Sequence, residues 1–235
     1  MSKRFYEHAA VAAVEGGFQV ELDGRAVKTP AGSALIMPTH ALAEAVAAEW
    51  NAQGDEIKPK SMALMPLVGT AIDRVPDVRD GLIEGLLRYA ETDLLCHRAT
   101  DREDLIERQE KMWQPLLDWA ADELGARLEP VHGIIAQDQD PVAIEAFKTA
   151  LEGFDNWTLT ALGELVGISG SLVVGLAVAK GRLDASQAFA VCQVDEDHQR
   201  EFWGEDFEAT ARREGIRVDL ATAYQFLKLS QGESV

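Results

Sequence analysis

The sequence has few of the residues and segments that mark several large classes of protein. Its only two cysteines, Cys96 and Cys192, exclude a disulfide framework. The apolar neighbours of each predict two buried thiols in a reducing compartment, and a single disulfide is the alternative. The longest apolar run, from Leu172 to Ala179, contains Gly175 and is too short to cross a bilayer. Residues 1–7 form no signal or transit segment, so we expect a soluble, intracellular protein without membrane insertion.

Basic residues are also scarce. Lys and Arg number 22 against 40 Asp and Glu, which gives a formal net charge of -18. Nucleic acids and anionic membranes bind clustered Lys and Arg, so we expect neither as a partner. A basic or hydrophobic protein partner suits the charge better, because acidity steers such an encounter. The glycines match neither a dinucleotide fingerprint nor a phosphate loop, so no nucleotide cofactor is expected.

The first part of the chain has the pattern of β-strands. Residues 18–22 alternate apolar and polar side chains, which is the period of a half-buried strand. Asp23-Gly24 follows, a dipeptide that favours a type I′ hairpin turn because both positions need positive φ. Residues 9–14, 25–29 and 34–37 supply three further strands. These segments predict a small antiparallel β-meander within the first 38 residues.

The rest of the chain is predicted to be helical. Thr39 is a suitable N-cap for a helix that ends near Gly54 and covers the meander. From about residue 67 onward apolar residues recur at helical spacing, including one continuous helix over 185–213 that ends before Gly215. We therefore predict an α+β fold, with a small α+β domain over 1–60 and a larger all-helical domain over 61–235.

Neither candidate metal cluster has enough ligands. Cys96-His97 is the only adjacent Cys-His pair, and zinc sites need several ligands at defined spacing. Asp195 and His198 have the spacing of a carboxylate-histidine site, but di-iron bundles carry two such pairs and the sequence has one. We expect no metal, no cofactor and no catalytic site.

Residues 194–206 form the most unusual segment, with six carboxylates and two large aromatics in thirteen residues. An acidic run on a helix is usually a solvated face, and the alternative is a surface that binds another protein. On a helix Glu196, Gln199 and Trp203 share one face. Trp203 then either belongs to an interface or lies buried with its indole N–H bonded to a carboxylate. Arg25, after the hairpin turn, is either a surface charge or a contact residue.

Several short segments, in this order and spacing, resemble the assembly chaperones of the ATP synthase alpha subunit, called ATP synthase mitochondrial assembly factor 2 in eukaryotes. The segments are Lys3-Arg4-Phe5-Tyr6, Leu22-Asp23-Gly24-Arg25, Thr29-Pro30, Glu49-Trp50, Gln53-Gly54, Thr70-Ala71-Ile72-Asp73, Arg88-Tyr89, Thr92-Asp93-Leu94-Leu95-Cys96, Gly170-Ser171-Leu172, Val194-Asp195-Glu196-Asp197, Gln199 and Trp203-Gly204-Glu205-Asp206. The chain departs from the family at residues 65–69, and at His97 and His198, where aromatics are common.

The resemblance implies a chaperone without ATPase activity that binds the free alpha subunit and prevents its aggregation until it pairs with beta. It also implies an essential acidic residue in the 194–206 segment, for which Glu196 is the foremost candidate. Further candidate contacts to the client are Asp195, Asp197, Gln199, Trp203, Glu205, Asp206 and Arg25. We expect a monomer in the bacterial cytoplasm, or in the mitochondrial matrix for a processed eukaryotic form. A carboxylate-site metalloenzyme and an acidic scaffold with another client are the alternatives.

Overall fold

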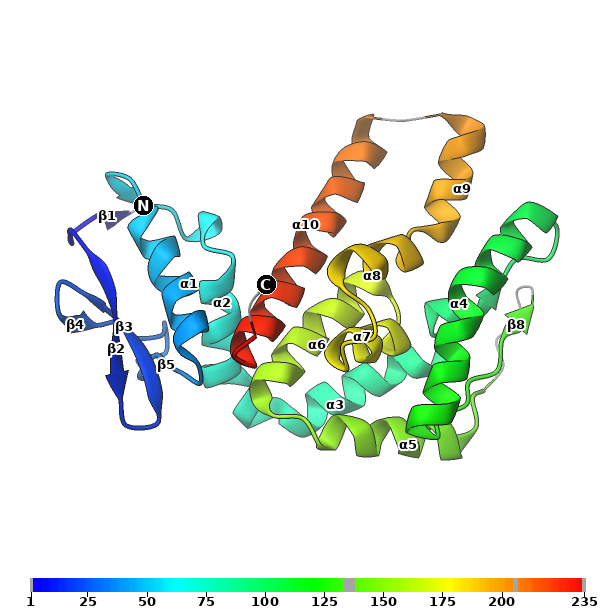
Figure 1. Cartoon of the computed structure of the whole chain (residues 1–235), viewed down its shortest axis with the longest axis horizontal. Helices are drawn as coiled ribbons and strands as arrows, with labels where there is room; N and C mark the ends of the chain where they lie inside the picture. The colour runs from blue at the N-terminus through cyan, green and yellow to red at the C-terminus, as the bar shows by residue number, and fades with distance from the viewer. Residues whose placement is uncertain (1, 133–137, 205–206, 234–235) are drawn as a thin grey trace. The chain divides into compact units, whose positions relative to one another are not determined.

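The computed structural model in Figure 1 describes residues 2–132, 138–204 and 207–233. The chain divides into two compact units, each assembled from separate stretches of sequence. The first comprises Met1–Arg79, Asp155–Ala161 and Gln225–Val235, and the second comprises Asp80–Phe154 and Leu162–Tyr224. Compactness alone does not show which segments fold independently, so the domain boundary near residue 60 stays a prediction.

The sheet of the first unit is small and antiparallel, as predicted. Strand β3 pairs with β2 along its full length, and with β4 and β5 at two successive stretches. The bounds are β2 Ala9–Val14, β3 Gly17–Leu22, β4 Arg25–Ala26 and β5 Ile36–Met37, and a separate pair joins β1 Ser2–Lys3 to β6 Glu56–Ile57. Asp23 and Gly24 have φ of 48° and 78°, which confirms the predicted primed turn.

Helix α1 (His40–Asn51) packs on β2 and β3 through Leu42, Ala43, Val46 and Ala47. The Thr39 hydroxyl caps its N-terminus by accepting from the Leu42 N–H, as the sequence predicts. Farther along α1, the Glu49 carboxylate accepts from two backbone N–H groups at the start of α2 (Leu64–Gly69). The chain continues through a π-helical turn at Thr70–Arg74.

The second unit is built from helices, several of which begin or end in the first unit. Their bounds are α3 Val75–Glu91, α4 Glu103–Leu124, α5 Pro141–Glu152, α6 Asn156–Ser169, α7 Leu172–Ala179, α8 Ala185–Cys192, α9 Val194–Trp203 and α10 Phe207–Ser230. Short 3₁₀ turns occupy Pro59–Ser61 and Leu94–Cys96, and β7 His97–Arg98 pairs with β8 Val131–His132 in parallel. Gly125, with φ of 68°, ends α4 in the left-handed conformation that glycine adopts readily.

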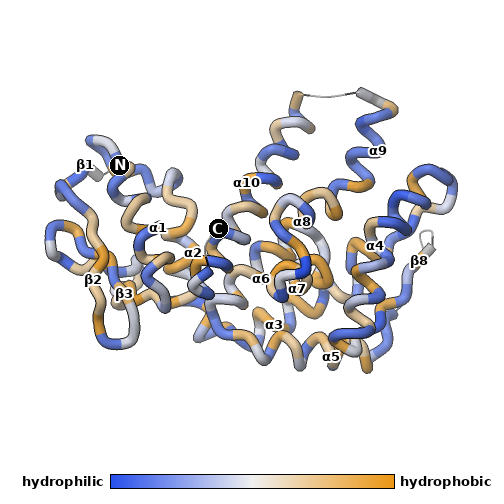
Figure 2. The backbone as a smooth tube through the Cα atoms, viewed as in Figure 1, coloured by the Kyte–Doolittle hydropathy of each residue, from blue (hydrophilic) through white to orange (hydrophobic). Residues whose placement is uncertain are grey.

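Helix α7 forms the buried centre of the second unit, and it is largely hydrophobic in Figure 2. A Cβ on Gly175 would lie 2.5 Å from Cγ2 of Val166, so this glycine permits the close approach of α7 to α6. The fully buried Asp93 carboxylate accepts from the N–H groups of Leu95 and Val173. It thereby joins the 3₁₀ turn to the first turn of α7.

Two predictions about the helices are wrong. Residues 185–213 do not form one helix: α8, α9 and α10 are separated at Gln193 and again at Gly204, whose φ is 82°. Gly215 is not a break, because it lies inside α10, where the cost of a helical glycine is only about 1 kcal/mol. Among the tryptophans, Trp113 is fully buried, whereas Trp50, Trp119 and Trp157 are half-buried.

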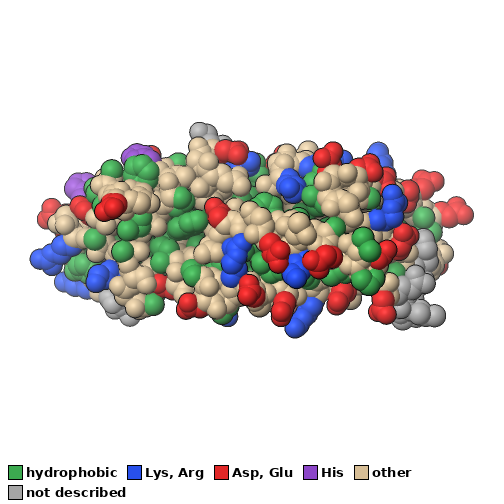
Figure 3. Space-filling model, turned by 90° about the horizontal axis from the view of Figure 1, so that it is seen from below, with side chains coloured by type: hydrophobic (Ala, Val, Ile, Leu, Met, Phe, Trp, Pro, Cys, Tyr) green, Lys and Arg blue, Asp and Glu red, His purple; other side chains and the backbone are tan. Residues whose placement is uncertain are grey.

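Both cysteines are free thiols in buried positions, as predicted, and no disulfide joins them. Burial raises the pKa of each thiol to about 12, so both stay protonated and unreactive. No helix within the described ranges is long and apolar enough to cross a membrane. Carboxylates are spread over much of the face drawn in Figure 3, with lysines and arginines interspersed.

Candidate functional site

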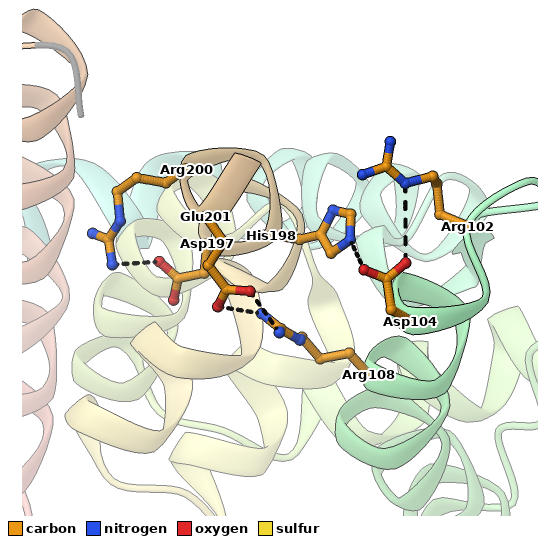
Figure 4. Close-up of polar contacts among 7 residues, drawn as sticks. All are labelled: Arg102, Asp104, Arg108, Asp197, His198, Arg200 and Glu201. Atoms are coloured by element: carbon orange, nitrogen blue, oxygen red, sulfur yellow. Dashed lines mark hydrogen bonds and ion pairs between the residues drawn. The ribbon is translucent and has the colours of Figure 1, made fainter. Parts of the chain in front are cut away.

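One side of the acidic helix α9 is bound to α4 by side-chain contacts. Gln109 Nε2 donates to Oδ1 of Asp195 at 2.8 Å, and the Gln109 side chain is itself buried. Six residues farther along α9, both carboxylate oxygens of Glu201 accept from the Arg108 guanidinium at 2.9 Å (Figure 4). This bidentate pair lowers the pKa of Glu201 and keeps it ionised.

His198 belongs to the same contact. Its ring is buried, and Nε2 lies 2.7 Å from Oδ2 of Asp104 in the first turn of α4 (Figure 4). Hydrogen bonding to His198 lowers the pKa of the Asp104 carboxyl. The Arg102 guanidinium stands 4.3 Å from the ring centroid of Phe202, which itself neighbours His198. The histidine that suggested a metal ligand therefore holds two helices together.

Asp197 points away from α4 and is held by arginines. Its Oδ1 lies 2.9 Å from Nη1 of Arg213 on α10 and 3.5 Å from Nη2 of Arg200 on α9. Arg213 also donates to the side-chain oxygen of Gln193, and its guanidinium stacks over Phe189. Asp197 therefore helps to position α10 against α8 and α9.

Two of the predicted contact residues on α9 remain exposed. Glu196 and Gln199 are both solvent-accessible and lie on the same face of α9, as their spacing predicts. Within the described ranges no hydrogen bond or ion pair holds either side chain. They are free to contact another molecule, whereas Asp195, Asp197 and Glu201 are occupied within the protein.

The other predicted contacts are one residue of the first unit and three residues near the end of α9. Arg25 is exposed on β4 of the first unit. The side chain of Trp203, together with Glu205 and Asp206, lies outside the described residues, so the two alternatives for the indole stay open. Cys96 is buried and His97 is exposed, which separates the pair that suggested zinc. Among the residues the structure describes, no group of three His, Cys, Asp or Glu could hold a metal ion.

The residues that position α9 had no signal in the local sequence. Asp104, Arg108 and Gln109 lie some ninety residues before their partners, and Arg213 was assigned to the same continuous helix as Asp197. The spacing of Asp104, Arg108 and Gln109 at i, i+4 and i+5 places these three residues on one side of α4, facing α9. The arrangement can present a carboxylate and an amide on a braced helix, which is chemistry suited to binding.

Comparison with known proteins identifies the chain's relatives. The model of a protein family described as "ATP12 chaperone protein" matches residues 3–121. A curated relative from Schizosaccharomyces pombe, named "Protein atp12, mitochondrial", is 27% identical over 214 residues, which cover 86% of this chain and 74% of that protein.

Two solved bacterial structures are similar over nearly the whole fold. The crystal structure of Atp12 from Paracoccus denitrificans is 40% identical, with a TM-score of 0.93 and coverage of 97% of this chain and 98% of that one. The structure of Atu1473 from Agrobacterium tumefaciens, titled a putative chaperone, is 41% identical, with a TM-score of 0.90 and coverage of 96% and 85%.

Proposed function

The chain belongs to the ATP12 chaperone family, which serves ATP synthase assembly, and we propose that its client is the free alpha subunit of the catalytic head. The exposed face of α9 is the proposed contact surface. There Glu196 accepts hydrogen bonds or an ion pair from the client, and Gln199 contributes a neutral hydrogen-bonding group. The carboxyl-terminal neighbours Glu205 and Asp206, together with Arg25, stay candidate contacts.

The observation that carries this proposal is the division of the acidic residues on α9. Asp195, Asp197 and Glu201 are each paired within the protein, so they brace the helix. Glu196 and Gln199 lie between them in sequence but have no partner in the described part of the chain. A braced helix that presents an unpaired carboxylate has little ordering entropy to lose when it binds a cationic partner.

The mode of action that we propose is binding alone. Subunits of a ring that has not yet assembled expose large apolar surfaces, and masking them suppresses misassociation. The beta subunit must later displace the chaperone, so the affinity is expected to be moderate. We propose that the protein has no enzymatic activity and needs no cofactor. The similarity to bacterial proteins supports the bacterial cytoplasm as its location, and the mitochondrial matrix is the alternative.

The test is protection of isolated alpha subunit from aggregation, with beta subunit and an unrelated aggregating protein as parallel clients. Wild type is expected to protect alpha selectively. Glu196→Lys is expected to weaken protection on the order of tenfold, because it replaces an accepting carboxylate by a repelling cation. The matched control is Glu123→Lys, which makes the same charge change at an exposed position near the end of α4.

Equal protection of all three clients, or none for alpha, would reject the alpha-specific proposal and favour an acidic scaffold with another client. Full protection of alpha by Glu196→Lys would show that the contact surface does not include this position on α9. A stoichiometric transition metal in the purified protein would revive the metalloenzyme alternative. Circular dichroism of each variant checks that the loss is not a loss of folding.

A further inference from the structure

A groove runs between α9 and the first half of α10, both within the second unit. Its volume is about 580 Å³, and its walls include Glu196, Gln199 and Arg200 from α9 and Arg212, Arg213 and Ile216 from α10. Figure 1 shows these two helical segments standing side by side beyond the body of the second unit. The groove opens on the face of α9 that carries the two exposed contact candidates.

The first half of α10 buries little of its own surface. No residue from Phe207 to Asp219 is buried, and the first buried residue is Leu220. Isolated helices of this length are marginal in water, and most helical stability in proteins comes from packing of an apolar face. Phe207 is 86% exposed, and Ile216 on the wall of the groove is half-buried. This helix therefore has apolar surface available for a partner.

The charges in the groove are partly satisfied and partly free. Three arginines face two carboxylates, so the groove is net positive in a chain whose formal net charge is -18. Asp197 is paired with Arg213 and Arg200 in the interior. Glu196 and Arg212, one on each wall, have no hydrogen bond or ion pair within the described ranges. Among the described residues of the groove, one acid and one base therefore lack a partner, and Ala209 and Ile216 contribute apolar lining.

We infer that this groove binds an amphipathic α-helix of the client, with its apolar stripe on Ala209 and Ile216, a cationic side chain on Glu196 and a carboxylate on Arg212. The inference rests on the proposed function and adds the form of the client segment and the second wall of its site. An apolar helix face laid in a groove is a recurring mode of recognition, read through anchors at i, i+3, i+4 and i+7. The client helix would add a third helix to the pair formed by α9 and α10, and would cover the groove side of the first half of α10.

The groove suits a helix better than a small ligand. Ligand pockets bury roughly 70–90% of a small molecule, whereas Glu196, Gln199 and Arg212 are all exposed on the walls of this open groove. An extended strand would find no unpaired sheet edge here, because both walls are helices whose backbone groups are bonded internally. Opposite charges on the two walls match a helix that carries both signs on one face.

The groove is tested by binding of isolated alpha subunit to variants of the full-length protein. Arg212→Glu and Ile216→Asp are each expected to raise the dissociation constant on the order of tenfold, because the first reverses a contact charge and the second puts a carboxylate in the apolar stripe. Lys111→Glu is the matched control for the first variant, at an exposed position on α4. Val218→Asp is the control for the second, on the same helix but outside the groove. Both controls are expected to change affinity less than twofold.

The form of the client segment is tested by a photo-crosslinking amino acid at Gln199, with position 123 as the control. Crosslinks to alpha are expected to fall on one segment at three- and four-residue spacing, and a synthetic peptide of that segment is expected to become helical on binding.

If wild type binds alpha while Arg212→Glu and Ile216→Asp keep full affinity, the groove is rejected as the contact site, but alpha remains the client. If wild type does not bind alpha, the proposed function fails first. A wild-type dimer that Arg212→Glu dissociates would show that the groove holds a second copy instead, and crosslinks to an extended segment would also overturn the inference.

Discussion

Helices α7 and α9 are of similar length but are held in place by different forces. Every residue of α7 from Leu172 to Val178 is buried, and a glycine brings it against α6. In the described part of α9 only Val194 and His198 are buried, and hydrogen bonds and ion pairs to α4 and α10 fix its orientation. Figure 2 shows the same contrast as a hydrophobic and a hydrophilic segment.

The difference separates residues that maintain the fold from residues that are available for recognition. A buried apolar helix gains most of its free energy from burial, so nearly every position matters to stability. A helix braced by polar contacts on two sides can leave a third side unoccupied at little cost in stability. Glu196 and Gln199 occupy that third side of α9, and we expect changes there to affect binding far more than folding.

The largest effect is expected in α7. Leu176 is fully buried, and Leu176→Ala should lower the free energy of unfolding by about 2–5 kcal/mol, because it leaves a cavity as well as losing burial. Gln199→Ala on α9 is the matched comparison and should change it by no more than about 0.5 kcal/mol. Urea denaturation followed by circular dichroism measures both. Similar losses for the two variants would remove the distinction between the helices.

An intermediate effect is expected at Asp93, which anchors the start of α7. Asp93→Asn should lower the free energy of unfolding by about 1–3 kcal/mol at pH 7. The two carboxylate oxygens accept from the N–H groups of Leu95 and Val173, whereas an amide has only one oxygen that can accept. Burial raises the pKa of Asp93 from 3.8 to about 6, so the folded protein takes up a proton there before the unfolded chain does. The wild type should therefore gain stability relative to Asp93→Asn as the pH falls from 7 to 4.5.

The gain in stability of the wild type relative to Asp93→Asn arises because protonation removes the buried negative charge. It is lost again as the pH rises through about 6, where the carboxyl ionises in the folded protein. Unfolding curves of both proteins at several pH values measure it. A stability difference that stays constant from pH 7 to 4.5 would show that the carboxyl is not ionised at neutral pH, or that it is hydrated.

The smallest effect on stability is expected for the Arg108–Glu201 pair between α4 and α9. Both side chains are partly exposed, so their coupling in a double-mutant cycle of alanine substitutions should be small and should weaken with salt. The ion pair lowers the pKa of Glu201 below 4.5, so the coupling should be present at neutral pH and disappear as the pH falls through the lowered value. A coupling that persists at high salt and at pH 3 would contradict an electrostatic origin.

Much of the fold could be predicted from local patterns. Alternation over residues 18–22 and the Asp23-Gly24 turn predict the hairpin, and Thr39 marks the start of a helix where the structure has it. The continuous helix predicted over 185–213 fails, because the break at Gln193 involves neither glycine nor proline. An exposed glycine at 215 is tolerated inside a helix, so its presence did not mark a boundary.

Many of the segments that carry the family resemblance have a structural role. The Asp23 carboxylate accepts from the backbone N–H groups of Glu7 and His8, and the Glu49 carboxylate caps α2. Asp93 binds the first turn of α7. These contacts join positions far apart in sequence, so motif matching alone could not separate scaffold residues from client contacts.

The amino-acid sequence by itself determines the acidic charge, the α+β class, the family and the position of the acidic helix, because these depend on composition, on local periodicity and on short segments in order. Only the tertiary structure decides which carboxylates of that helix are occupied. Asp195, Asp197 and Glu201 meet partners from α4 and α10, whereas Glu196 faces the groove. Whether a carboxylate is paired depends on which side chains the fold brings within about 3 Å, and that distance is set by packing between residues that are distant along the chain.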